Sequence, residues 1–152
     1  MALDLGAELR GIVRALDAAE IAYALVGGLA VSIYAVPRAT EDIDILIAPG
    51  DLARTVQRLT PLGFRPAGAP MPVAAGRLDI QRLIKIDGPD LVALDLLLPN
   101  DAGLAALLTN PNVTEWQEGR LSIVSLEGLR TLKRLRGSAQ DRADLEALGP
   151  EP

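Results

Sequence analysis

The fold is decided by Val26-Gly27-Gly28 and, shortly after it, by Arg38-Ala39-Thr40-Glu41-Asp42-Ile43-Asp44-Ile45. The first stretch closes an apolar run with a diglycine, which predicts a buried strand, a tight turn and the start of a helix. The second stretch opens another apolar run with a D-x-D pattern. Side chains alternate along a strand, so both aspartates leave one face, while the core receives Ile43, Ile45 and Ile47.

Asp42 and Asp44 together indicate a cation site. Two carboxylates this close repel each other unless a positive charge lies between them, and a divalent cation supplies it. The alternative is a solvated strand edge that carries the short pattern by chance.

Asp95 strengthens the metal interpretation, because it interrupts the apolar run from Leu91 to Leu98. Burying a lone carboxylate costs several kcal/mol unless it is paired or bound to metal. Three carboxylates on neighbouring strands favour a two-metal site, with the metals about 4 Å apart. The alternative is a structural salt bridge, with Arg82 as the candidate partner.

Composition restricts the chemistry further. The sequence has no cysteine and no histidine, which excludes disulfides, thiolate and imidazole metal ligands and a Ser-His triad. Carboxylates prefer hard cations, so Mg²⁺ or Mn²⁺ is the expected metal. The net charge of −5 argues against general electrostatic binding to nucleic acid.

The sequence indicates a cytoplasmic protein without membrane contact. Its start carries Asp4 and Glu8 rather than the positive charges of a secretory signal. The longest uncharged run, 21–37, is interrupted by the diglycine and is short of the roughly 20 apolar residues of a membrane span.

Periodicity predicts an α/β (α+β) fold, a mixed β-sheet with flanking helices, in a single domain over 1–152. We expect 78–86 and 91–98 to pair as a hairpin, Asp51 to cap a helix, 65–76 to form a loop and 110–119 to be irregular. Helices are expected over 5–16, 29–35, 51–59, 101–108 and, as C-terminal helices, within 125–148; strands are expected over 21–26, 42–48, 78–86, 91–98 and 121–124.

Other residues suit a phosphate ligand. Gly27 and Gly28 allow close backbone approach at a helix N-terminus, although an ordinary tight turn explains them equally. Arg38 and Thr40 either contact phosphate oxygens, brace the carboxylates or lie on a surface loop. Lys133 lies on the helix face away from the leucines, either near a triphosphate or on a solvated basic face. Asp141 and Asp144 fit surface or bracing charges.

Taken together, V-G-G, R-x-T-x-D-I-D-I and the strand aspartate resemble the nucleotidyltransferase superfamily with the DNA polymerase β-like fold. The sequence is most similar to the bacterial AbiEii/AbiGii type, whose K…R…D-x-x-D-L element resembles the stretch from Leu132 to Leu145. The resemblance implies phosphate-contacting glycines at Gly27 and Gly28, metal ligands at Asp42, Asp44 and Asp95, and a triphosphate lysine at Lys133. The superfamily often has G-S at the turn; here Gly28 offers backbone alone, and Ser32 follows one turn later.

The resemblance implies transfer of an NMP group from an NTP to an acceptor hydroxyl of a small molecule, a protein or an RNA. Asp95 would share the metal that activates the acceptor or act as its general base. A cognate toxin or antitoxin is the implied protein partner. The alternatives are a non-catalytic module of the same fold that binds a nucleotide or a partner, and a toxin or antitoxin acting by protein contact.

Overall fold

The computed structural model describes residues 3–35, 37, 40–116 and 119–149. Short 3₁₀ turns lie at 49–51, 60–62, 74–76 and 106–108. The helices are α1 (Leu5–Ala18), α2 (Gly27–Tyr34), α3 (Leu52–Leu59), α4 (Ala102–Ala105), α5 (Leu126–Arg136) and α6 (Ala139–Leu148). The strands are β1 (Tyr23–Val26), β2 (Asp42–Ile47), β3 (Arg65–Pro66), β4 (Met71–Val73), β5 (Leu78–Asp87), β6 (Asp90–Pro99), β7 (Asn112–Trp116) and β8 (Gly119–Ile123).

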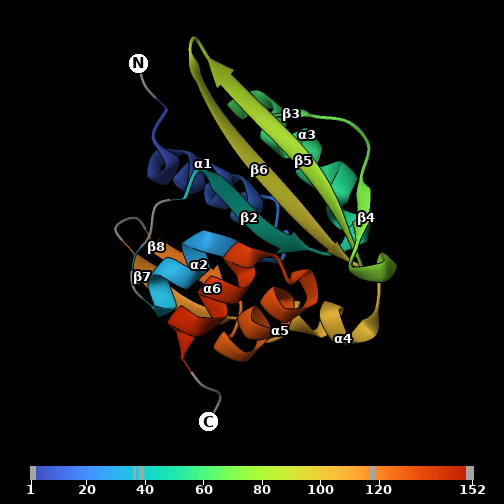
Figure 1. Cartoon of the computed structure of the whole chain (residues 1–152). Coiled ribbons are helices and arrows are strands. Elements are labelled where there is room, and N and C mark those ends of the chain that lie inside the picture. Colours follow the sequence, from blue (N-terminus) through green and yellow to red (C-terminus); the bar gives the residue numbers. More distant parts are fainter. Residues whose placement is uncertain (1–2, 36, 38–39, 117–118, 150–152) are drawn as a thin grey trace.

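The strands form one mixed sheet of eight strands in the order β3-β5-β6-β2-β1-β8-β7, with β4 paired to β5. β2 pairs with β6 in parallel and with β1 in antiparallel fashion, and β5 and β6 form the expected hairpin. Figure 1 shows α1 and α3 behind the sheet, and α2, α5 and α6 gathered in front of it. The predicted α/β fold with a mixed sheet and flanking helices is confirmed.

The central strand β2 has one apolar and one acidic face. Ile43, Ile45 and Ile47 are 0% exposed, as their alternation predicts. Asp42 and Asp44 are only partly buried on the opposite face. The apolar face fixes the register, because a slip by one residue would turn the isoleucines outward and bury the aspartates.

Two segments are more regular than expected. Residues 65–76 contain β3 and β4, which both pair with β5, and 110–119 contains β7, which pairs with β8. The expectations of a loop and of an irregular segment are therefore wrong. These strands are short and largely exposed, so they carry no apolar alternation, and a proline is tolerated at a sheet edge.

The start of α3 also differs from its prediction. Asp51 lies at the N-cap position, but its side chain makes no capping hydrogen bond with the helix backbone. Its carboxylate instead accepts from Arg54 Nη1 at 3.1 Å. A 3₁₀ turn over 49–51 leads the chain into the helix, so no side-chain cap is present.

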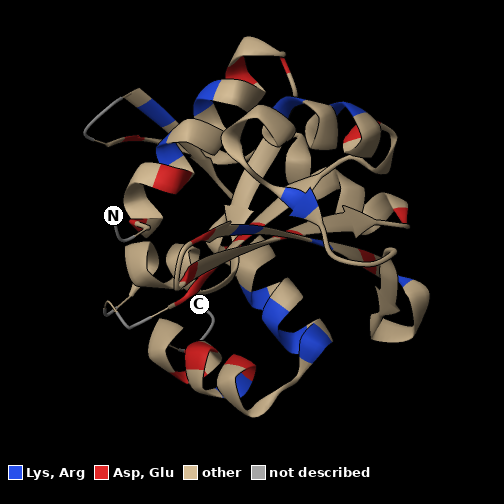
Figure 2. Cartoon of the chain, turned by 90° about the horizontal axis from the view of Figure 1, so that it is seen from above, with Lys and Arg blue, Asp and Glu red and all other residues tan. Residues whose placement is uncertain are grey.

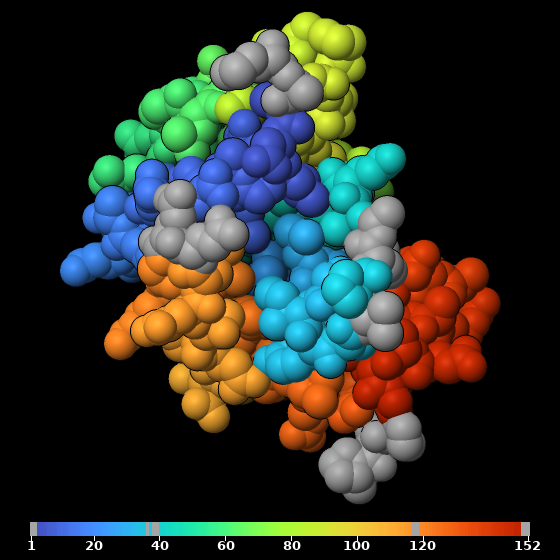
Figure 3. Space-filling view, turned by 90° about the vertical axis from the view of Figure 1, so that its left-hand side faces the viewer, coloured from blue at the N-terminus to red at the C-terminus, as the bar shows by residue number. Residues whose placement is uncertain are grey.

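The helix α2 lies between distant parts of the sequence. It packs against β2, α5 and α6. The space-filling view shows its cyan surface between the orange segment of the chain and the red C-terminal helices (Figure 3). The helix thus packs against elements that carry predicted site residues. Throughout the described residues, every helix is too short or too polar to cross a membrane.

Candidate functional site

The sheet brings the three predicted carboxylates onto adjacent strands. Asp44 on β2 lies directly beside Asp95 on β6, and Asp42 lies beside Ala93. Asp95 is 7% exposed. The acidic face of β2 therefore continues across β6, as the sequence predicts.

Arg82 on β5 contacts two of these carboxylates. It lies opposite Asp95 in the hairpin register. Its Nε and Nη2 atoms donate to the two Asp95 oxygens at 2.8 and 2.9 Å, and Nη2 lies 3.5 Å from Asp42 Oδ2. The salt bridge that was the alternative interpretation of Asp95 is therefore present.

The carboxylates are adjacent but do not converge as a closed cation cage. Within the described ranges, no three His, Cys, Asp or Glu side chains are arranged to hold a metal ion. The donor set itself suits a hard cation, because Asp42 and Asp44 leave the same face of β2. Arg82 contacts Asp95 and also lies 3.5 Å from Asp42, so Asp44 is the carboxylate of the three for which no ion pair with Arg82 is seen.

Asp44 is the site carboxylate whose pKa is raised. Burial, followed by the charge of Asp95, raises the pKa of its carboxyl from 3.8 to about 6, and Asp42 adds to the shift. Arg136 and Lys133 act in the opposite direction. In the described part of the chain, its carboxylate makes no hydrogen bond or ion pair. An ionised carboxylate in this environment is stabilised by a nearby positive charge, so the position favours a cation.

Gly27 is required where it meets Asp44. Its φ of +70° is left-handed, and a Cβ built there would lie 2.2 Å from Asp44 Oδ2 and 2.7 Å from Asp44 Cβ. Gly27 opens α2 directly after β1, and no side chain caps this helix start. The first backbone N–H groups of α2 therefore lie at a helix N-terminus beside the carboxylates, an arrangement suited to phosphate oxygens.

We expect Gly27→Ala to destabilise the protein by about 2–4 kcal/mol, because the left-handed backbone and the collision with Asp44 both add cost. Gly137→Ala is the matched control. Gly137 has a φ of +61°, but its Cβ would find nothing closer than Arg134 O at 3.7 Å. The control should cost about 1 kcal/mol in urea unfolding. Equal losses in the two variants would show that the contact with Asp44 is not limiting.

Lys133 is buried rather than solvated. It is 8% exposed, and its Nζ lies 3.1 Å from Asp141 Oδ1 and 2.8 Å from Asp144 Oδ2. The solvated basic face is thus wrong, because the apolar side of α5 and the start of α6 enclose this side chain. Asp141 and Asp144 are bracing charges, 7% and 1% exposed.

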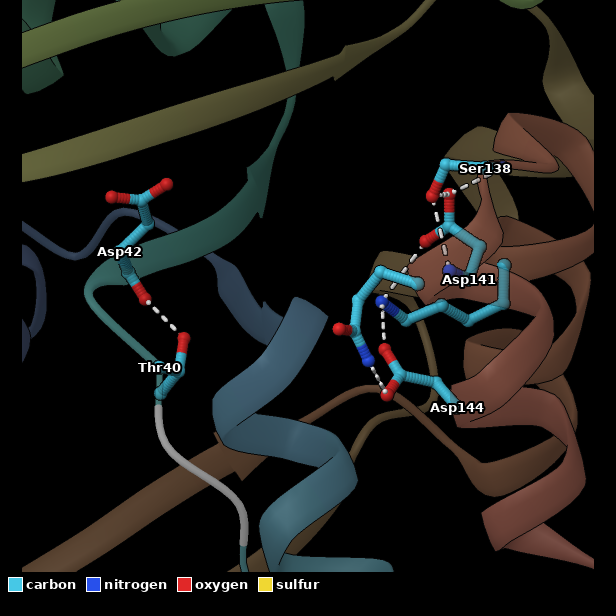
Figure 4. Close-up of polar contacts among 7 residues, drawn as sticks. Thr40, Asp42, Ser138, Asp141 and Asp144 are labelled. Atoms are coloured by element: carbon cyan, nitrogen blue, oxygen red, sulfur yellow. Dashed lines mark hydrogen bonds and ion pairs between the residues drawn. The ribbon is translucent and has the colours of Figure 1, made fainter.

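The cluster of Lys133, Asp141 and Asp144 adjoins the capping box of α6. Ser138 and Asp141 exchange hydrogen bonds there, and Gln140 donates to Asp144 at 2.9 Å. Burial alone would raise the pKa of Asp141, but the hydrogen bonds from Ser138 and Lys133 hold it below 3.8. Figure 4 shows this group on α6, with the Asp42 carboxylate directed away from it at the start of β2.

Arg136 lines two cavities at the candidate site. It lines a small cavity of about 40 Å³ together with Gly27, Asp44, Lys133 and Asp141. It also lines a larger cavity that Arg82 and Asp95 border. Figure 2 shows the basic segments of α5 facing the acidic segments of the central strands. In the sequence, Arg136 is the arginine of the K…R…D-x-x-D-L element and has no predicted role of its own. Its spacing of three from Lys133 was the available signal.

The remaining predicted nucleotide-binding residues are Thr40, Gly28, Ser32 and Arg38. Thr40 donates its hydroxyl to the backbone oxygen of Asp42 at 3.4 Å, so it braces the strand start rather than the carboxylates. Gly28 is buried in the first turn of α2. Ser32 is partly buried further along this helix and outside the lining of the cavity at Gly27. Arg38 lies outside the described residues.

Searches of protein-family models and of curated proteins return no match for this sequence. Solved structures do match. The lincosamide antibiotic adenylyltransferase LnuA, bound to lincomycin, aligns with a TM-score of 0.61 and 16% identity over 97% of this chain and 98% of its own. A proposed nucleotidyltransferase from Thermotoga maritima gives a TM-score of 0.61 and 13% identity over 95% and 94%.

A third match is ANT(2'')-Ia in complex with adenylyl-2''-tobramycin, with a TM-score of 0.56 and 15% identity over 92% of this chain and 84% of its own. At these identities the similarity establishes the fold. The chain has the nucleotidyltransferase fold, and it places adjacent carboxylates and a glycine-opened helix on the central strands of that fold.

Proposed function

We propose that the protein is a metal-dependent nucleotidyltransferase that moves an NMP group from an NTP to an acceptor hydroxyl. The observation that carries this proposal is the position of the Asp44 carboxylate, which lies between Asp95 and the Gly27 turn. Within the described residues it makes no hydrogen bond or ion pair. The matched solved structures include proteins named as nucleotidyltransferases, which supports the same class of reaction.

Asp42 and Asp44 would hold Mg²⁺ or Mn²⁺, with Asp95 as a third carboxylate. The bound cation would neutralise triphosphate charge and activate the acceptor hydroxyl. The backbone N–H groups at Gly27 and Gly28 face the phosphate oxygens, and Arg136 adds positive charge beside them. Lys133 is engaged by two aspartates, so its main task here is to order α5 and α6 around the site.

The reaction exchanges one phosphorus–oxygen bond for another. The acceptor oxygen bonds to the α-phosphorus, and the bond from that phosphorus to its bridging oxygen breaks. Pyrophosphate leaves, and the hydroxyl proton passes to the Asp95 carboxylate. Catalysis then rests on positioning and on charge stabilisation.

Transfer from labelled nucleotides tests this function. The protein is incubated with Mg²⁺ and each NTP labelled at the α- or the γ-phosphate, together with pooled small molecules, proteins and RNA. Nucleotidyl transfer moves the α-label to an acceptor and releases the γ-label as pyrophosphate. With no α-label transferred, release of the γ-label as inorganic phosphate would identify a phosphatase, and transfer of the γ-label to an acceptor would identify a kinase.

The contacts of Arg82 favour one second function, a non-catalytic module that binds a nucleotide or a partner. Arg82 already neutralises Asp95, as a cation would in an active site. Mg²⁺-dependent NTP binding without label transfer to any acceptor class distinguishes this module from the enzyme.

Arg82→Met should strengthen Mg²⁺ binding by roughly tenfold, because the cation no longer competes with a guanidinium. Arg77→Met is the control, since the Arg77 side chain is also 49% exposed and pairs with Asp101 away from the site. Calorimetric titration with Mg²⁺ measures both. Unchanged affinity in Arg82→Met would place the cation elsewhere.

The resemblance to the AbiEii/AbiGii type adds a toxin–antitoxin role and a cognate protein partner to the proposal. Expression that arrests growth, with relief by the product of a neighbouring gene, tests this role. Growth unaffected by expression would remove it without affecting nucleotidyl transfer.

A further inference from the structure

A cavity of about 650 Å³ opens beside Asp95, on the opposite side of the carboxylates from the Gly27 turn. Its walls come from residues 67–71, Val73 and Ile80, and its polar end is formed by Arg82, Asp95 and Arg136. Sites for small organic ligands usually occupy about 300–1,000 Å³. The size alone is thus suited to one small molecule.

The wall of this cavity is fixed by the sheet. Ala67 N donates to Arg82 O at 2.9 Å, and the Gln81 side chain donates to Gly68 O at 3.0 Å. Gln81 is 5% exposed, so this bond is sheltered from water. Met71 pairs with Ile80 across β4 and β5. The wall is therefore pre-formed and does not need a ligand to order it.

The described lining of the cavity has an apolar wall and a charged end. The side chains of residues 67–71, Val73 and Ile80 have no charge and no hydrogen-bonding group. Charge is confined to the end where Asp95 lies. Met71 is 64% exposed, an apolar side chain left open to solvent at the rim.

We propose that this cavity binds the acceptor, and that the acceptor is a compact, uncharged molecule with an apolar body and a hydroxyl group. This inference rests on the proposed function. The apolar body lies against Met71, Val73 and Ile80, and the hydroxyl reaches the Asp95 end, where the α-phosphorus arrives from the Gly27 side. The hydroxyl oxygen bonds to that phosphorus, its proton passes to Asp95, and pyrophosphate leaves.

Two other acceptor classes suit the cavity poorly. A polycation needs several carboxylates, but among the described residues the lining holds one, Asp95, which Arg82 already neutralises. An RNA end needs aromatic side chains for base stacking and basic residues along a phosphate track. In the part of the lining that the structure describes, no residue is aromatic, and Arg82 and Arg136 both lie at the polar end.

Methionine methyl NMR tests this inference, because the sequence contains only two methionines. Met71→Leu assigns the Met71 signal. The probes are 4-nitrophenyl β-D-glucopyranoside, which is neutral with an aromatic body and hydroxyls, the polycation tobramycin, and a short oligoadenylate RNA. We expect the glucoside to shift the Met71 signal saturably, and the other two to leave it in place.

Met71→Glu should weaken glucoside binding at least about tenfold in calorimetry, since a carboxylate would be desolvated against the apolar body. Val113→Glu is the control, because Val113 is 56% exposed on β7, outside the cavity. It should bind as the wild type does. Equal binding by both variants, a Met71 signal unmoved by the glucoside, or a shift with tobramycin or RNA alone would overturn the inference.

A parallel titration with Mg²⁺ and a non-hydrolysable NTP separates this inference from the proposed function. Nucleotide binding without a glucoside shift at Met71 would reject the acceptor class alone. A glucoside shift without nucleotide binding would reject nucleotidyl transfer and leave a small-molecule site.

Discussion

Asp44→Asn should reduce nucleotidyl transfer by roughly 10³-fold or more, because it removes the charge best placed to hold the cation. Transfer of α-label at saturating Mg²⁺ and NTP measures the loss. Asp87→Asn is the matched control, since Asp87 is an exposed aspartate at the far end of β5. It should transfer label as the wild type does. Equal rates in the two variants would remove Asp44 from the cation site.

The same substitution should change stability in the opposite direction. The pKa of Asp44 is raised from 3.8 to about 6 in the folded protein. The native state therefore binds more protons than the unfolded state between these values, and stability falls as pH rises through this window. Without metal at pH 8, Asp44→Asn should gain up to about 3 kcal/mol.

Urea unfolding of wild type and Asp44→Asn from pH 4 to pH 8 measures this difference. The gain should vanish near pH 4, where the wild-type carboxyl is also protonated. Mg²⁺ should stabilise the wild type at pH 8 and leave the variant unchanged. A variant that is less stable than the wild type at pH 8 would show that Asp44 is satisfied within the fold.

Lys133→Met should destabilise the protein by about 3–5 kcal/mol, because it removes the buried ammonium group that Asp141 and Asp144 share. Asp144, which is 1% exposed, bears most of this cost. The effect is structural, since α5 and α6 meet at this cluster. Thermal and urea unfolding at neutral pH measure it.

The double variant Lys133→Met with Asp144→Asn is the control for this cluster. Removing the Asp144 charge should recover part of the lost stability, and comparison with Asp144→Asn alone gives the coupling energy between the two residues. A loss below about 1 kcal/mol in Lys133→Met, or additive losses in the double variant, would mean that the pair is weakly coupled.

The central strands were predictable because their pattern is local. Alternating isoleucines specify β2, and an apolar run specifies β6. The hairpin of β5 and β6 follows from two apolar runs joined by Asp87-Gly88. The edge strands β4 and β7 were missed, because their residues are exposed and their order comes from pairing with a neighbour.

The types of residue in the candidate site could be predicted from the sequence. Which of these residues lie beside each other could not. The parallel register of β2 and β6 sets Asp44 beside Asp95, and no local pattern specifies that register. For Lys133 the sequence left two interpretations open, a triphosphate contact and a solvated basic face. Neither includes its ion pairs with Asp141 and Asp144, because only the packing of α6 brings these aspartates onto it. The pairing of Arg82 with Asp95 was an open alternative until the hairpin register set them opposite each other.

A crystal structure with Mg²⁺ and a non-hydrolysable NTP is the most direct test of the proposed site. The account predicts a cation bound by Asp42 and Asp44, with the triphosphate oxygens on the backbone N–H groups at Gly27 and Gly28. A nucleotide bound away from the Gly27 turn, or Arg82 still neutralising Asp95 with no cation on Asp42 and Asp44, would contradict it.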